Sequence, residues 1–387
     1  MKATLLYIYA LLAALTLGAC SDNYLDTESN DAEKRLILSK TSYIAMAVNG
    51  LSKMMSTQYL SSQGMNGEGA ILTLYGNYHG NDFQKCDLTG WVQMTNLDFV
   101  ENSTSIYDYY PWYYYYKILG NANAIINNVD AATGPDNEKR FLKAQALTFR
   151  AYCFFRLSQV YSKRWSDSNN GASRGVVLRL DESTGDMAVS TLAETYARIY
   201  QDLDDALALY AESKLNRDED ENYAVNADVA HAIYARAALT REDWAVAASH
   251  AASARANYTL MNNAQYVNGG FNAPNKEWIW SVYSNAQETL YFYQFFANQG
   301  SNTNAALARN YPCAISKELY DSIPTTDVRR AMFLNPDTMT FNTSSGLAGK
   351  WMTAYAKRAY KKKLYSTSRI YAYMQFKMQA VSNPGVG

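Results

Sequence analysis

Between residues 112 and 257, apolar side chains recur at the three-and-four spacing that marks one face of a helix. Pro135 suits the first turn of one such segment, and Asn226 suits the cap of another. The capping-box sequence from Thr191 to Glu194 opens a third. The pattern therefore predicts a mainly α fold with five amphipathic helices, at about 112–129, 135–161, 191–210, 226–240 and 244–257.

The last two of these segments resemble a tetratricopeptide repeat, a unit of two antiparallel helices and about 34 residues that stacks on copies of itself. Ala235, Ala247 and Ala254 stand at the repeat's three small-residue positions. His231 and Thr259 stand where the repeat has tryptophan and proline, so a plain antiparallel hairpin explains the same alanines equally well. In either case, alanine at facing positions lets two helices approach closely.

The flanking segments differ in kind from this helical scaffold, which we place mainly at 108–262. Residues 61–107 are rich in Gly, Asn, Tyr and Thr without a sustained period, and 262–349 mixes short aromatic runs with Asn/Gly loops. Such composition is typical of long loops and short strands. Because binding residues concentrate on loops that a rigid scaffold positions, we take the candidate ligand residues from these two segments.

The start of the chain has the layout of a bacterial lipoprotein signal. Lys2 and an apolar run at 5–17 lead to two small residues directly before Cys20. The run is 13 residues long and covers ~20 Å as a helix, less than the ~30 Å core of a bilayer. We predict a signal peptide at 1–19, lipidation of Cys20 and a polar tether at 20–40. The alternative is an ordinary secretory signal in which Cys20 is incidental.

Composition disfavours some partners and favours others. Lys and Arg total 35 against 36 Asp and Glu, so no net field attracts nucleic acid or an acidic membrane surface, and we expect membrane contact through the lipid anchor only. Cys86, Cys153 and Cys313 are widely and irregularly spaced, which indicates core residues rather than a disulfide framework. The 33 tyrosines each combine an apolar face with a hydrogen-bonding tip, which suits the binding of sugars or peptides.

Six residues of the loop-rich segments are candidate glycan-binding residues: Tyr78, Asn81, Asp82, Trp91, Trp278 and Trp280. The first four combine stackable rings with amide and carboxylate groups that hydrogen-bond hydroxyls, the pairing that sugar recognition needs. Trp91 could instead anchor a loop or the core. The two later tryptophans alternate like one face of a strand, so core packing is the alternative for them.

The sequence contains no recognisable catalytic or metal-binding set. His79, His231 and His250 lie far apart in the chain, and no serine-hydrolase elbow, zinc-protease motif or phosphate-binding loop occurs. The acidic group from Asp202 to Asp205 is expected on the solvated face of its helix. We therefore expect no catalytic residue, no metal and no cofactor, although two carboxylates are enough for a glycosidase and 36 acidic residues leave that possible.

Four sequence motifs occur in a fixed order: the lipoprotein signal at Cys20, an aromatic-to-Ala-Asn segment at 112–123, an A-x-A-x-x-x-R-A segment at 143–152, and an R-x-A-L-x-x-x-D-W segment at 236–245. Together they resemble the SusD/RagB family of outer-membrane glycan-binding lipoproteins of Bacteroidetes. The resemblance implies a scaffold of tetratricopeptide-like hairpins with a ligand face made by the irregular segments. It also implies a cell-surface location and a partner, a TonB-dependent SusC-like transporter on which such proteins sit as a lid.

The C-terminal end departs from the family pattern. Family members continue past a strand like that at 371–377 and a Pro-Gly turn like that at 384–385 into closing helices with an R-x-x-E-x-x-L-x-x-A-E signature. This chain stops at Gly387 without them. We therefore expect residues 41–387 to form a single SusD-like domain that is either truncated at its C-terminus or unusually short.

The resemblance favours capture of oligosaccharide for import, and two other functions stay open. A surface glycosidase would cleave the oligosaccharide that a binding protein only retains. A tetratricopeptide-type scaffold would bind proteins through a concave helical groove, with the loop-rich segments turned away.

Overall fold

The computed structural model describes most of the middle of the chain and parts of its flanks, at residues 36–57, 67–72, 75, 83–85, 102–267, 274–282, 313–334 and 366–367. Within these residues the fold is mainly helical, as the sequence predicts. Its long helices are α3 (Thr41–Met54), α6 (Ile106–Asn128), α7 (Asp136–Tyr161), α8 (Leu192–Ser213), α9 (Ala227–Thr240) and α10 (Trp244–Arg255). None of the described helices is both long enough and apolar enough to cross a lipid bilayer.

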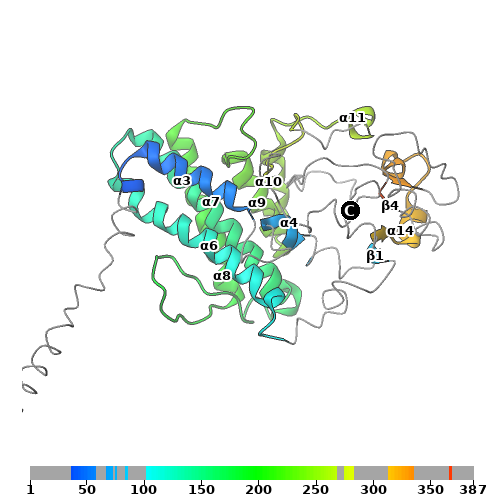
Figure 1. Ribbon diagram of the computed structural model, residues 1–387, viewed down its shortest axis with the longest axis horizontal. Helices are drawn as coiled ribbons and strands as arrows, with labels where there is room; N and C mark the ends of the chain where they lie inside the picture. Colours follow the sequence, from blue (N-terminus) through cyan, green and yellow to red (C-terminus); the bar gives the residue numbers. More distant parts are fainter. Residues whose placement is uncertain are drawn as a thin grey trace, which may run out of the picture.

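Short elements complete the described residues: α4 (Gly67–Ile71), β1 (Phe83–Lys85), α11 (Asn263–Val267), β2 (Cys313–Ile315), α14 (Lys317–Ser322), β3 (Phe333–Leu334), β4 (Ser366–Thr367) and the 3-10 turns η3 (Val129–Ala131), η4 (Trp165–Asp167) and η5 (Val328–Met332). Two antiparallel ladders join β1 to β2 and β3 to β4. In Figure 1, α3, α6, α7 and α8 lie side by side, while α14, β1 and β4 gather at a distance from them.

Local capping explains where the predicted helices begin. The Thr191 hydroxyl accepts from the backbone N–H of Glu194, and the Glu194 carboxylate accepts in return from the backbone N–H of Thr191, so the expected capping box forms. The Asn226 side chain accepts from the backbone N–H of Val229 at the start of α9. Both predicted starts are confirmed, whereas α10 ends at Arg255, two residues earlier than predicted.

Helix α6 begins at Ile106, six residues before the predicted start, and it contains Pro111. Proline has no backbone N–H, so the carbonyl of Tyr107 loses its helical donor. The hydroxyl of Tyr75 donates to that carbonyl instead. One residue further on, the Tyr161 hydroxyl accepts from the backbone N–H of Trp112 at 2.9 Å and donates to the Asp108 carbonyl at 2.6 Å. Two tyrosine hydroxyls thus satisfy backbone groups around the proline, and the helix continues through it.

Much of the tyrosine excess is core packing in the described structure. Tyr110, Tyr114 and Tyr115 of α6 are fully buried, as is Tyr152 of α7. The Tyr115 and Tyr152 hydroxyls each donate to one oxygen of the buried Glu68 carboxylate at 2.8 Å, which ties α4 to both long helices. Burial raises the pKa of both hydroxyls well above the usual value, so they stay protonated as donors.

The predicted solvent exposure of Asp202 is wrong. Its side chain is fully buried between α7 and α8, where both carboxylate oxygens accept from the Arg150 guanidinium, at 2.7 and 2.8 Å. Arg198, one turn before Asp202 on α8, adds a contact at 2.6 Å. The third Arg150 nitrogen donates to the side chain of Asn123 on α6 at 3.1 Å. Arg150 and Asn123 belong to the motifs singled out in the sequence, and here they link three helices.

Helices α9 and α10 form the predicted close hairpin. Ala235, Ala247 and Ala254 are all buried. The turn brings His231 and His250 together, with a hydrogen bond of 2.8 Å between their Nδ1 atoms, although the two residues lie far apart in sequence. Outside this hairpin, the thiol of Cys153 is buried in α7, as expected of a core cysteine, and burial raises its pKa.

Candidate functional site

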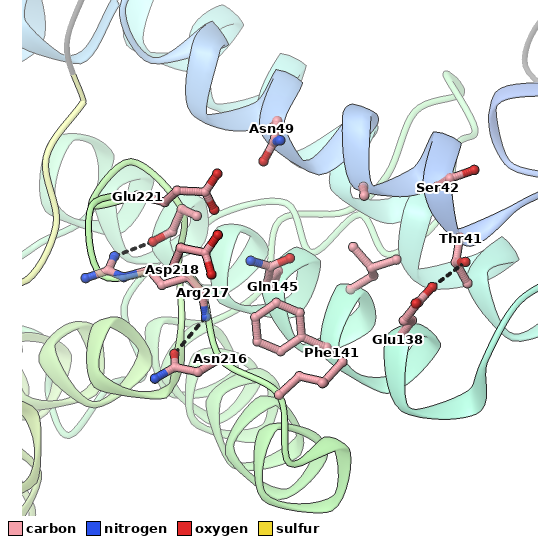
Figure 2. Close-up of a pocket in the computed structure, with 14 residues that line it drawn as sticks. Thr41, Ser42, Asn49, Glu138, Phe141, Gln145, Asn216, Arg217, Asp218 and Glu221 are labelled. Carbon is pink, nitrogen blue, oxygen red and sulfur yellow. Dashed lines mark hydrogen bonds between the residues drawn. The ribbon is translucent and has the colours of Figure 1, made fainter.

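A cavity of about 430 Å³ lies between α3, α7 and residues 214–224, the segment that follows α8 (Figure 2). In the figure, α3 forms one wall, α7 the floor, and 214–224 the opposite wall. The polar and charged side chains that line it are Thr41, Ser42, Asn49, Glu138, Gln145, Asn216, Arg217, Asp218 and Glu221. Its volume lies within the ~300–1,000 Å³ typical of small-molecule sites.

The α3 wall is fixed to the start of α7. The backbone N–H of Thr41 donates to the Thr133 carbonyl at 3.0 Å, and its hydroxyl donates to the Glu138 carboxylate at 2.6 Å. Gly134 makes this close approach possible, because a Cβ at that position would lie 2.2 Å from the Thr41 hydroxyl oxygen. Its φ of +152° is also one that other residues rarely adopt. The rim of the cavity near Glu138 is therefore held rigidly.

The opposite wall is held by Arg217. Lys214 ends α8 in the left-handed conformation and turns the chain toward the cavity. The Arg217 guanidinium then donates to the carbonyls of Ala224 and Ile279, and to the Tyr258 hydroxyl at 3.2 Å. These hydrogen bonds hold residues 214–224 in place on the side away from the cavity.

Trp278 and Trp280 support this wall, which corrects their assignment to a ligand face. Both are fully buried, so neither ring can stack on a sugar in this structure. The Trp280 indole N–H donates to the Tyr223 carbonyl at 3.1 Å, and the Trp278 carbonyl accepts from the Asn222 amide at 2.7 Å. Ile279 between them is also buried and residues 278–280 do not form a strand, so the two tryptophans pack in the core and support residues 222–223, the alternative that the sequence had left open.

Three carboxylates give the cavity a negative character. Glu138, Asp218 and Glu221 line it, and none of them forms an ion pair among the described residues. Neutral hydroxyls donate to two of them: Thr41 to Glu138 at 2.6 Å and Tyr223 to Glu221 at 2.6 Å. Within the described part of the chain, no three His, Cys, Asp or Glu side chains are grouped so that they could hold a metal ion.

An apolar platform lies beside these acids. Phe141 and Leu142 of α7 line the cavity together with Leu215, and the Phe141 ring packs edge-on against Tyr210, with ring centres 5.6 Å apart. Next to them, the almost fully buried Gln145 donates from its amide nitrogen to the Val225 carbonyl at 2.8 Å. A ring face bordered by amides and carboxylates can contact a sugar ring and hydrogen-bond its hydroxyl groups.

The remaining site predictions fall on residues that the structure does not describe. Tyr78, Asn81, Asp82 and Trp91 lie outside the described residues, as does Cys20. They stay predictions.

Sequence reasoning also missed the cavity. Its walls come from three segments far apart in the chain, around 41–49, 138–145 and 214–224. The one local signal was the acidic run at 218–221 between two helices, which composition alone does not distinguish from a solvated turn.

Comparison with known proteins identifies relatives of this fold. Residues 23–239, more than half of the chain, match a SusD-like family model described as starch-binding associating with outer membrane. A SusD-like carbohydrate binding protein from Bacteroides vulgatus has a similar structure, with 24% identity and a TM-score of 0.63 over 76% of this chain and 61% of that one. A putative sugar binding protein from the same organism is 23% identical, with a TM-score of 0.64 over 76% of this chain and 65% of that one. A laminarin binding SusD-like protein is 15% identical, with a TM-score of 0.57 over 88% of this chain and 72% of that one.

These structural likenesses show a shared fold. The chain spans less than two thirds of the length of the two Bacteroides vulgatus structures. No curated protein sequence matches it. The family model alone covers more than half of the chain, including α3 and α6 to α8 and nearly all of α9, and on that match the protein belongs to the SusD-like family.

Proposed function

We propose that this protein is a cell-surface lipoprotein that captures oligosaccharide and delivers it to a TonB-dependent SusC-like transporter. The observation that carries the proposal is the family match over 23–239, because the family is described by starch binding and association with the outer membrane. Relatives with the same fold are named as carbohydrate, sugar and laminarin binding proteins, which supports the same ligand class. In this proposal the anchor is the lipid on Cys20.

Binding rather than cleavage is the proposed role of the ligand-contacting residues. The cavity beside Phe141 offers an apolar face with polar groups around it, and Tyr78, Asn81, Asp82 and Trp91 offer the same combination in the sequence. We propose that oligosaccharide contacts both sets. Contacts of this kind are shallow and wet, so we expect dissociation constants of about micromolar to millimolar, or roughly −8 to −4 kcal/mol.

Calorimetry of the purified protein with neutral starch-type and laminarin-type oligosaccharides tests the proposal. We expect weak saturable binding to at least one of them, reduced in Trp91→Ala and in Asp82→Ala, with the oligosaccharide recovered intact. Unchanged binding in both variants would move the site away from this segment, and shortened products would favour a glycosidase. Purification in mild detergent should also recover a larger barrel-forming partner, which a tetratricopeptide-type scaffold for other proteins would not require.

A further inference from the structure

The charge balance of the cavity between α3, α7 and residues 214–224 selects among ligands. Glu138, Asp218 and Glu221 line it without ion-pair partners among the described residues. Arg217 is the one cationic side chain among the described lining residues, and its guanidinium donors are directed to backbone carbonyls and to Tyr258. The walls therefore present negative charge and hydrogen-bond acceptors, which disfavours uronic or sulfated sugars and favours a cation.

Gln145 adds a neutral acceptor that suits a ligand carrying donors. Its side chain is only 4% exposed and faces the cavity from α7, as Figure 2 shows. The amide nitrogen donates to the Val225 carbonyl, but the amide oxygen has no hydrogen-bond partner among the described residues. That oxygen is not fully enclosed by protein atoms, so it stays open to the cavity and can accept from an N–H or O–H group of a ligand.

The kind of cation follows from the spacing and the neighbouring surface. Among the described residues, these acids are not grouped as metal ligands would be, so their charge is spread over the cavity walls. A compact metal ion does not suit that arrangement, whereas an organic cation with several donors does. Phe141 and Leu142 supply an apolar surface against which a sugar ring can lie.

We infer that this cavity binds an amine-bearing saccharide, with protonated amines of different sugar units facing Glu138 at one end and Asp218 and Glu221 at the other, and a sugar ring lying against Phe141. The inference rests on the proposed glycan-binding function and adds a substrate class to it. It assigns the acidic run after α8 a direct role in ligand selection. A lysine-containing peptide carries the same ammonium group without the ring, and the test below separates the two.

The experiment compares three probes by calorimetry on the purified protein at mildly acidic pH, where sugar amines carry protons. The probes are a short β-linked glucosamine oligosaccharide, its N-acetylated counterpart, and a lysine tripeptide. We expect the glucosamine oligosaccharide to bind at least about fivefold more tightly than the acetylated one, as for several exposed ion pairs acting together. Added salt should reduce that ratio, because exposed charges are screened.

Charge-neutralising variants locate the effect. Asp218→Asn and Glu221→Gln should each weaken binding of the glucosamine oligosaccharide by roughly twofold to fivefold and weaken binding of the acetylated one by a smaller factor, because an amide still hydrogen-bonds hydroxyl groups but carries no charge. Asp220→Asn is the matched control, because Asp220 is exposed in the same segment but does not line the cavity. An effect of Asp220→Asn equal to that of Asp218→Asn would show a diffuse charge effect and overturn the inference.

Two further outcomes separate this inference from the proposed function. Equal affinity for the amine and acetylated probes, with neutral oligosaccharides still bound, would overturn the inference and leave the function standing. Absence of binding to every saccharide would overturn both. Tighter binding of the lysine tripeptide than of the glucosamine oligosaccharide would assign the cavity to peptides and overturn the saccharide assignment.

Discussion

Helices α7 and α8 are held together differently from helices α9 and α10. Across the first pair, the Arg150 guanidinium binds both oxygens of the fully buried Asp202. Across the second, small side chains such as Ala235 and Ala254 permit close approach, and the main polar contact is the hydrogen bond between His231 and His250. The first interface therefore depends on both partners of a buried ion pair. The second depends on small side chains and on one hydrogen bond between two histidine rings.

The difference shows how each interface can fail. A buried ion pair gains little over an apolar pair of similar shape, but loss of one partner leaves the other charge buried and uncompensated. A close-packed alanine interface has no charge to lose and fails when a larger side chain is introduced. Variants of each kind should therefore destabilise the protein by different amounts and for different reasons.

Asp202→Ala should have the largest effect. It leaves the Arg150 guanidinium, whose side chain is 6% exposed, without its carboxylate, and we expect a loss of about 3–5 kcal/mol in the free energy of unfolding. Urea denaturation followed by circular dichroism measures it. Asp205→Ala is the matched control, because Asp205 is half exposed and lies 3.8 Å from Arg198, so its loss should stay within about 0.5 kcal/mol. Equal losses for the two variants would contradict this account of the buried pair.

Ala254→Leu should have an intermediate effect. Ala254 is fully buried in the α9–α10 hairpin, and three extra carbons would force the helices apart at a cost of about 1–3 kcal/mol. Ala252 lies two residues earlier on α10 and is exposed, so Ala252→Leu adds the same carbons without crowding. The same urea titration compares the two variants. A loss in Ala252→Leu as large as that in Ala254→Leu would point to helix propensity or solubility rather than to packing.

The sequence predicted what local periodicity and capping control. Helices α7, α8 and α9 begin where Pro135, Thr191 and Asn226 indicated. Helix α6 begins before its predicted start and continues through Pro111, a residue type that normally ends a helix. The tyrosine hydroxyls that accommodate this proline come from Tyr75 and Tyr161, far away in the chain.

Asp202 shows a second kind of limit. It lies three residues after Ile199 and four before Ala206, both of which are buried, so helical period alone places it on the buried face of α8. Its charge led to the opposite prediction, because the partner Arg150 is on another helix. The cavity could not be predicted for the same reason. None of its three segments carries a local sequence signal of a binding site, and only tertiary packing brings Asn49, Gln145 and Asp218 around one space.

The smallest expected effect is the pH dependence of the α9–α10 hairpin. One Nδ1 of the His231–His250 pair donates to the other, so the contact fails when both rings carry protons on Nδ1. Burial lowers the pKa of both histidines below 6.5, and His250 lowers that of His231 further, while Asp228 and Asp204 oppose these shifts. The unfolded chain therefore binds more protons in this range, so stability falls as pH drops through 6.5 toward the lower folded pKa values.

The double variant His231→Gln, His250→Gln isolates this contribution. Urea titrations at neutral and mildly acidic pH give the free energy of unfolding of the parent and of the variant. On acidification the parent should lose more of this free energy than the variant does. The difference should be less than about 1 kcal/mol, because both rings are partly exposed. His79 and all carboxylates are common to both proteins, so their titration cancels in the comparison. Identical pH dependence in the two proteins would show that the histidine contact, although short, does not couple α9 and α10 to the proton concentration.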